Sequence, residues 1–269
     1  MASLQGLSSA VLDAAKRQLK YKAACHWVTL ISAAVSIFTA GVVLYILAFV
    51  ALISELSSWF LAISAANKKS LGQELLRLNI LKQSYREDMA IDTAYLKARV
   101  SCSELQAGDD FDNPEYYSTR DDSPPARLIE ILQESCFWSQ RLYTACRDRA
   151  IKASVGLAVA IAVVIVVGLS VAGPDPNYSA PRLAILFLML VPLWTEIEKA
   201  LSFGSAASRL ALTDHRLDVS GQNQASILSI FADYNVVTSN TPLIPQKVYE
   251  NERGRLNELW AERRRRGNL

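Results

Sequence analysis

Long runs of apolar residues with almost no charge dominate this chain and restrict what it can fold into. One block covers Trp27 to Ala66 with Glu55 as its only charge, and a second covers residues 153–172 with none. A third covers residues 183–203 and is interrupted only by the charged stretch that begins at Glu196. A helix needs about 20 residues to cross the hydrocarbon of a bilayer, so the first block is long enough for two crossings. We therefore expect an all-α integral membrane protein with four spans, arranged as two transmembrane helical hairpins with cytoplasmic helices.

Basic residues flank these apolar segments on one side only. Four Lys or Arg lie within residues 16–22, before the first block, and two Lys follow it at 68–69. Cytoplasmic segments are enriched in Lys and Arg, so both flanks are expected inside, which requires a turn within residues 41–50. By the same argument both termini and Arg120 face the cytoplasm, and Asn177, in a Gly/Pro-rich turn, faces out. We expect no cleaved signal peptide, because the first span can act as an uncleaved anchor.

Five regions follow from this topology. They are an amphipathic N-terminal helix at 1–26, a first transmembrane hairpin at 27–66, a cytoplasmic helical region at 67–152 with an acidic loop at 107–125, a second transmembrane hairpin at 153–203, and a cytoplasmic C-terminal helical tail at 204–269.

Local start and stop signals refine the inner regions. Ser123, followed by two prolines, predicts the start of a helix that continues into the third span. The helix of the second span is expected to extend to about residue 89. In the tail we expect one helix over 196–234, a break at 241–245, and a last helix that ends in four arginines at 263–266. These arginines either bind acidic lipid headgroups or form a solvated tail.

Polar residues within the apolar blocks are the candidates for a pore lining. Thr29, Ser32, Ser36 and Thr39 recur at intervals of three and four and predict one hydroxyl stripe along the first span. Such a stripe either packs against another helix or faces a water-filled path. A carboxylate at membrane depth is costly and usually faces a partner or water, although the serines around Glu55 also fit a position near the interface. Repeated around an oligomer, Glu55 or Glu196 would form a ring that attracts cations.

The sequence lacks the motifs of several functional classes. It has no nucleotide-binding glycine loop, no nucleophile elbow, no HExxH and no CxxC, so we expect no enzyme, no cofactor and no metal site. Its formal net charge of +2 argues against binding a nucleic acid polymer by bulk charge. The acidic loop lacks the spacing of a calcium loop and is interpreted as solvated.

Three segments of the chain have the character of a known family. Residues 129–149 hold an aromatic and basic lead into the third span, residues 207–210 are Ala-Ser-Arg-Leu, and residues 242–249 are Pro-Leu-Ile-Pro-Gln-Lys-Val-Tyr. With the order hairpin, inner region, hairpin, helical tail, they resemble the SMODS-associated four-TM pore-forming effectors of bacterial cyclic-nucleotide antiphage defence (CBASS). Gln246 and Lys247 stand where that family has Asp-Trp.

The resemblance implies an effector that disrupts the bacterial inner membrane in abortive infection when a partner synthase makes a cyclic nucleotide. It supplies no ligand residues. Phosphates are natural partners of arginine, so basic inner residues are the candidates for binding a cyclic oligonucleotide, with positive-inside anchoring as their other role. These residues are Arg141, Arg147, Arg209 and Arg216.

Two functional hypotheses remain from the sequence. The first is a pore-forming effector, embedded in the lipid bilayer as a homo-oligomer and gated through its inner helices. The second is a membrane scaffold that docks a soluble signalling partner and conducts nothing. A water-tolerant stripe such as that in the first span favours the first hypothesis.

Overall fold

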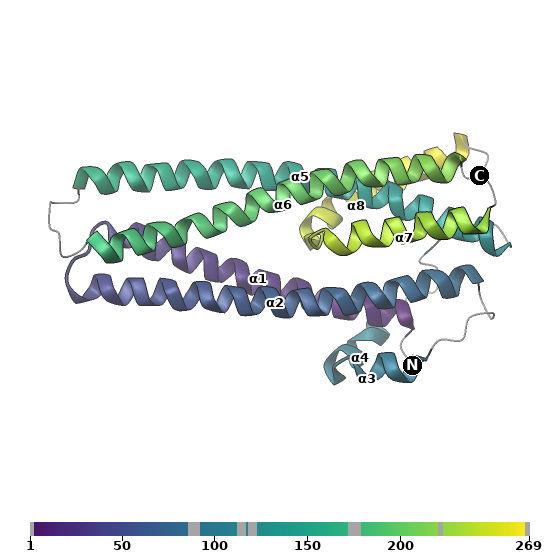
Figure 1. Cartoon of the computed structure of the whole chain (residues 1–269), viewed down its shortest axis with the longest axis horizontal. Helices are drawn as coiled ribbons and strands as arrows, with labels where there is room; N and C mark the ends of the chain where they lie inside the picture. The colour runs from purple at the N-terminus through teal and green to yellow at the C-terminus, as the bar shows by residue number, and fades with distance from the viewer. Residues whose placement is uncertain are drawn as a thin grey trace. The chain divides into compact units, whose positions relative to one another are not determined.

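The computed structural model describes residues 3–85, 92–111, 117, 123–171, 179–219 and 223–266. In these ranges all regular structure is helical, which confirms the all-α prediction (Figure 1). The helices are α1 (Leu4–Ser36), α2 (Val42–Tyr85), α3 (Thr93–Ala98), α4 (Cys102–Asp110), α5 (Pro124–Val171), α6 (Ser179–Val219), α7 (Gln224–Asn240) and α8 (Gln246–Arg266).

Several helix ends lie where the local signals predicted them. Helix α5 begins at Pro124, and the N–H of Arg127 donates to the carbonyl of Ser123 at 2.9 Å. It runs without a break to Val171, so the inner lead helix and the second apolar block, the expected third span, are one helix. The predicted break after α7 is also present, because residues 242–245 are non-helical and α8 begins directly after them.

The turn of the first hairpin lies earlier than predicted. Helix α1 ends at Ser36 and α2 begins at Val42, so the turn covers residues 37–41 rather than 41–50. Gly41 has a φ of 69°, a left-handed conformation that costs glycine little because it has no Cβ. Thr39 therefore lies in the turn and not on the helix, which shortens the predicted stripe.

The tail and the acidic loop also differ from the prediction. The expected helix over 196–234 is two helices, because α6 ends at Val219 and the side chain of Asn223 caps α7 by accepting from the N–H of Ala225 at 3.1 Å. The first residues of the expected loop, 107–110, belong to α4, which a capping box at Ser101 starts. Most of the rest of that loop, and the expected end of α2 near residue 89, lie outside the described residues.

The chain divides into two compact units. Unit 1 comprises residues 1–16, 67–147 and 201–269, and unit 2 comprises residues 17–66 and 148–200. Helices α1, α2, α5 and α6 each contribute to both units. Unit 2 overlaps the stretches in which the two hairpins are predicted, 27–66 and 153–203, and begins ten residues before the first and five before the second.

Unit 1 has a conventional apolar core. Leu128, Leu132 and other apolar residues of α5 pack there with residues of α6 and α7, such as Leu210 and Ile230. A second cluster joins the start of α1 to α2, where the Oγ of Ser8 donates to the carbonyl of Gly72 at 2.7 Å.

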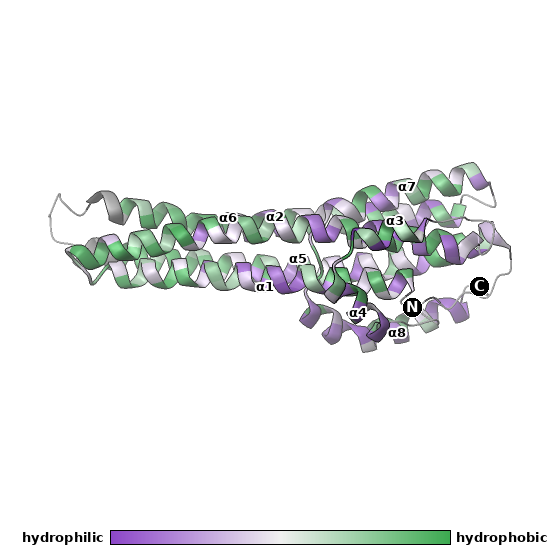
Figure 2. Cartoon of the chain, turned by 90° about the horizontal axis from the view of Figure 1, so that it is seen from below, coloured by the Kyte–Doolittle hydropathy of each residue, from purple (hydrophilic) through white to green (hydrophobic). Residues whose placement is uncertain are grey.

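Unit 2 is apolar on its outside as well as within. Its core contains Ala33, Leu44 and Met189, and Figure 2 shows mostly hydrophobic residues along its helices, whereas α8 in unit 1 is largely hydrophilic. Among the described residues, two helices are long and apolar enough to cross a membrane, α2 over Val42–Tyr85 and α5 over Pro124–Val167.

Candidate functional site

A polar cluster lies between α1 and α2 inside unit 2. The imidazole of His26 donates from Nδ1 to Oε1 of Glu55 at 3.1 Å, and the Oγ of Ser58 donates to Oε2 at 3.2 Å. Nearby, the Oγ of Ser54 donates to the carbonyl of Cys25 at 2.8 Å and ties the two helices together. The Glu55 and His26 side chains are only 6% and 13% exposed, so Glu55 is buried and has a basic partner that is largely shielded from solvent.

One atom of this cluster has no visible partner. Nε2 of His26 is buried, and among the described residues no donor or acceptor reaches it. Buried polar atoms are normally hydrogen-bonded to protein or to ordered water. The cluster is therefore a place where water is expected to enter unit 2.

The hydroxyl stripe faces the inside of unit 2. Thr29, Ser32 and Ser36 are all buried, whereas Thr39 is only half-buried. The hydroxyl of Ser36 donates to the carbonyl of Ala33 at 2.7 Å, within its own helix. A hydroxyl that donates to a carbonyl of its own helix needs no other partner. Such a side chain can therefore face either an apolar neighbour or a water-filled path.

Unit 2 also has charged side chains on α1 and α6. Glu196, the other predicted ring carboxylate, pairs with Lys199 at 2.5 Å on α6. The amine of Lys22 on α1 is within electrostatic range of both, and of Glu55 and Glu198.

The four candidate ligand arginines do not form one site. Arg209 is exposed on α6, and Arg216 pairs with Asp233 of α7 at 2.5 Å. The side chain of Arg147 packs beside Gly204, where an added Cβ would lie 3.2 Å from its Cδ. Arg141 lies elsewhere in unit 1, in a groove.

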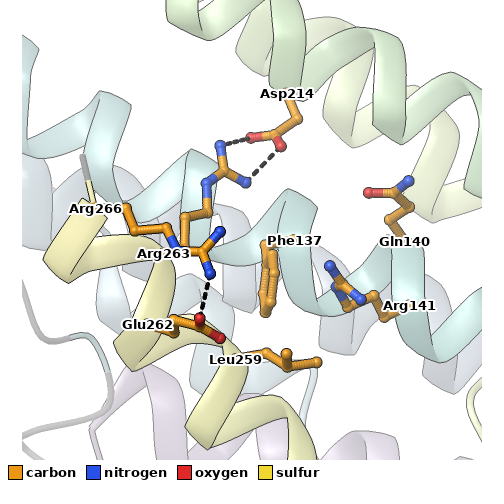
Figure 3. Close-up of a pocket in the computed structure, with 8 residues that line it drawn as sticks. All are labelled: Phe137, Gln140, Arg141, Asp214, Leu259, Glu262, Arg263 and Arg266. Carbon is orange, nitrogen blue, oxygen red and sulfur yellow. Dashed lines mark hydrogen bonds and ion pairs between the residues drawn. The ribbon is translucent and has the colours of Figure 1, made fainter.

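The groove of Arg141 has a volume of about 510 Å³ and is formed by α5, α6 and α8 (Figure 3). Phe137 and Arg141 come from α5, Asp214 from α6, and Arg263 and Arg266 from α8. Arg263 donates to both carboxylate oxygens of Asp214, at 2.6 and 3.0 Å. This hydrogen-bonded ion pair raises the pKa of Arg263 above its ordinary value, so the guanidinium is permanently charged.

A second polar site in unit 1 joins α2 to the end of α7. Lys69 donates to the carbonyl of Ser239 at 2.5 Å, and Gln73 donates to that of Thr238 at 2.7 Å. Arg77 reaches the carbonyl of Asn235 at 3.3 Å. The last carbonyls of a helix lack partners within it and carry partial negative charge, so this row of α2 side chains caps α7.

Burial lowers the pKa of Lys69 in this row to about 8. Next to it, Lys68 pairs with Glu104 of α4. Burial alone would raise the pKa of Glu104, but hydrogen bonds from Lys68 and Ser101 outweigh it and hold that pKa below its usual value.

Sequence reasoning did not identify the α7 cap or the members of the groove other than Arg141 and the tail arginines. The spacing of Lys69, Gln73 and Arg77 by four residues indicates a common helix face, and so does the spacing of Phe137 and Arg141. Neither spacing indicates which segment lies opposite.

Comparisons with family models, curated proteins and solved structures find no match to this chain. In the part of the chain that the structure describes, no three His, Cys, Asp or Glu residues gather in a way that could hold a metal ion.

Proposed function

We propose that this protein is a pore-forming effector of the bacterial inner membrane that acts in antiphage abortive infection and is triggered by a cyclic nucleotide. In this proposal unit 2 is embedded in the bilayer as a homo-oligomer. Unit 1 and both termini lie in the cytoplasm, where unit 1 responds to the signal.

The outer surface of unit 2 supports the membrane part of the proposal. Only 22% of the apolar window of α2 and 11% of that of α5 are buried, whereas the core helix of a soluble protein would be mostly buried. Large apolar side chains such as Phe38, Phe60 and Phe187 are about 70% exposed. Soluble monomers rarely expose apolar patches larger than a few hundred Å².

The lengths of the helical segments suit four crossings. The parts of α1, α2, α5 and α6 that belong to unit 2 each hold about 20 residues or more, the length a crossing needs. The first crossing then starts near Arg17, and Lys20 and Lys22 must extend their amines toward the interface, as long basic side chains do.

The single observation that carries the pore is the buried polar cluster of His26 and Glu55. A carboxylate inside a unit with an apolar surface is costly and normally marks an ion or water path. The unpartnered Nε2 of His26 and the stripe at Ser32 extend the polar character of the same interior. Apolar side chains fill the rest of that interior, so a path opens only if the hairpins rearrange.

The filled interior also favours the alternative, a non-conducting scaffold that docks a soluble signalling partner through unit 1. A scaffold needs a stable membrane anchor but no polar interior. The buried His26–Glu55 pair has no role in it, and for that reason we prefer the pore.

Two experiments test the proposal. Cysteines placed at Arg120 and Asn177, in a chain without other cysteines, should react with an impermeant reagent from the cytoplasmic side and the outer side, respectively. Labelling of the Arg120 position from outside would exclude the two-hairpin topology.

The second experiment measures flux. Purified protein in liposomes should release ions only when the correct member of a panel of cyclic di- and trinucleotides is added, since a ligand opens a pore only by binding the open state more tightly. Flux that is unchanged across the panel would exclude direct nucleotide gating. Liposomes that stay tight under all conditions would favour the scaffold.

A further inference from the structure

The groove between α5, α6 and α8 is lined by three arginines, two of which are held in ion pairs. Arg263 is neutralised by Asp214, which engages both of its terminal nitrogens, and it also lies 3.7 Å from a carboxylate oxygen of Asp218. Arg266 pairs with Glu262 at 2.5 Å. Among the described residues no carboxylate pairs with Arg141, so it is the one arginine of the groove lining without an ion pair.

Arg141 is held in position although it lacks an ion pair. Its guanidinium lies 4.6 Å from the centre of the Phe137 ring, and Figure 3 shows it extending toward that ring. Phe137 is itself buried and packs against Trp260 with ring centres 5.2 Å apart. Stacking on a fixed aromatic ring orients a guanidinium and leaves its N–H donors free for a planar or tetrahedral anion.

A second cation in the groove is easily released. The Arg266 and Glu262 side chains are 80% and 53% exposed, and an exposed ion pair spaced by four residues on a helix is weak because water screens it. An anion that offers several oxygens can therefore displace Glu262. The partly buried contact between Arg263 and Asp214, which has two hydrogen bonds, remains as the wall of the groove.

We propose that this groove binds a phosphate-bearing ligand, with Arg141 as the principal contact and Arg266 as the second. Phosphate oxygens match the fork of guanidinium donors, and a volume of about 510 Å³ is sufficient for a ligand of nucleotide size. A role of this ligand as the trigger of the pore rests on the proposed function. Binding of the ligand to the groove does not depend on a pore. The phosphate comes either from a soluble ligand or from a lipid headgroup.

The experiment compares both sources with the full-length protein in nanodiscs. In phosphatidylcholine discs, calorimetric titration with inorganic pyrophosphate tests the soluble source. Exchange into discs that contain phosphatidylglycerol, followed by mass spectrometry of the lipids retained by the protein, tests the headgroup. Binding in either arm identifies the source and supports the site.

The variants then assign the binding to the groove. R141Q should weaken it about tenfold or more, because a charge-assisted contact is lost, and R141K should retain part of it. R253Q changes the same charge on an exposed position of α8 outside the groove and should bind within twofold of wild type. If circular dichroism shows that R141Q does not fold, R266Q tests the site instead, and it should also weaken binding.

Three results would overturn the proposal. They are binding in neither arm, wild-type binding by R141Q and R266Q, and an equal loss in R253Q. The binding experiment measures no flux, so its result is independent of the pore. If the protein binds phosphate but the liposome experiment shows no release of ions, the pore is refuted and the binding site stands.

Discussion

The pair formed by His26 and Glu55 makes a sharp prediction about stability. In Glu55→Ala, the carboxylate that accepts from His26 at 3.1 Å and from Ser58 at 3.2 Å is lost. Leaving a buried imidazole without a partner costs about 1–3 kcal/mol in a soluble protein. Within a membrane the lower half of this range applies, since the unfolded reference state also finds partners.

Loss of the side chain adds a small cavity, so we expect Glu55→Ala to destabilise the protein by about 2–3 kcal/mol. For a chain of 269 residues, that corresponds to a fall in Tm of roughly 4–5 °C. Glu55→Gln keeps the size and the hydrogen-bonding oxygen of the side chain, and we expect it to remain within about 1 kcal/mol of wild type.

Thermal unfolding in detergent, followed by fluorescence-detected size exclusion, measures both variants. A Tm of Glu55→Ala equal to that of wild type would refute the idea that this carboxylate is a buried, paired group. A loss in Glu55→Gln as large as that in Glu55→Ala would show that the charge, rather than the hydrogen bonds, stabilises unit 2.

Three further predictions follow from other positions. Changing Ser32 and Ser36 to Leu should abolish ion flux, whereas membrane insertion should persist because Leu enters hydrocarbon more readily than Ser. Wild-type flux in this variant would exclude a path along this face, and the double Ala variant controls for added bulk. The pKa of Lys69 is lowered from 10.5 to about 8, so the unfolded chain binds more protons in this range and stability should rise as the pH increases from about 8 to 10.5. Because this side chain is partly exposed, we expect a gain of only about 1 kcal/mol, and denaturation curves at several pH values should show that Lys69→Met removes it. A Cβ at Gly72 would lie 2.7 Å from side-chain atoms of Leu12, so Gly72→Leu should cost about 1–3 kcal/mol in thermal unfolding, and a second change, Leu12→Ala, should restore most of it.

Much of the secondary structure could be predicted from local sequence. The start of α5 at Ser123 and Pro124, and the break at residues 242–245, depend on capping and on the fixed φ of proline, which act within a few residues. The turn at 37–41 was missed because apolar residues surround it and only Gly41 marks it. The single helix predicted over 196–234 was wrong for a similar reason, since Asn223 was not recognised as a cap.

The candidate site could be predicted only in part. The placement of Thr29, Ser32 and Ser36 on one face follows from the helical spacing of their hydroxyls. The sequence also singled out Glu55 as a carboxylate in an apolar block, but it left open whether Glu55 lies at membrane depth or near the interface. Its partner His26 was not predicted, because pairing depends on how α1 and α2 align across the turn.

The sequence by itself determined that this chain is helical and that apolar runs recur along it, because hydropathy and helix capping act over short distances. Only the tertiary structure decided which polar groups meet. Lys69 reaches the carbonyl of Ser239 across 170 positions of sequence, and Arg263 reaches Asp214 across 49. Such contacts depend on the packing of several helices at once, and many alternative pairings share the same local pattern. The groove around Arg141 and the cap on α7 are therefore properties of the folded chain.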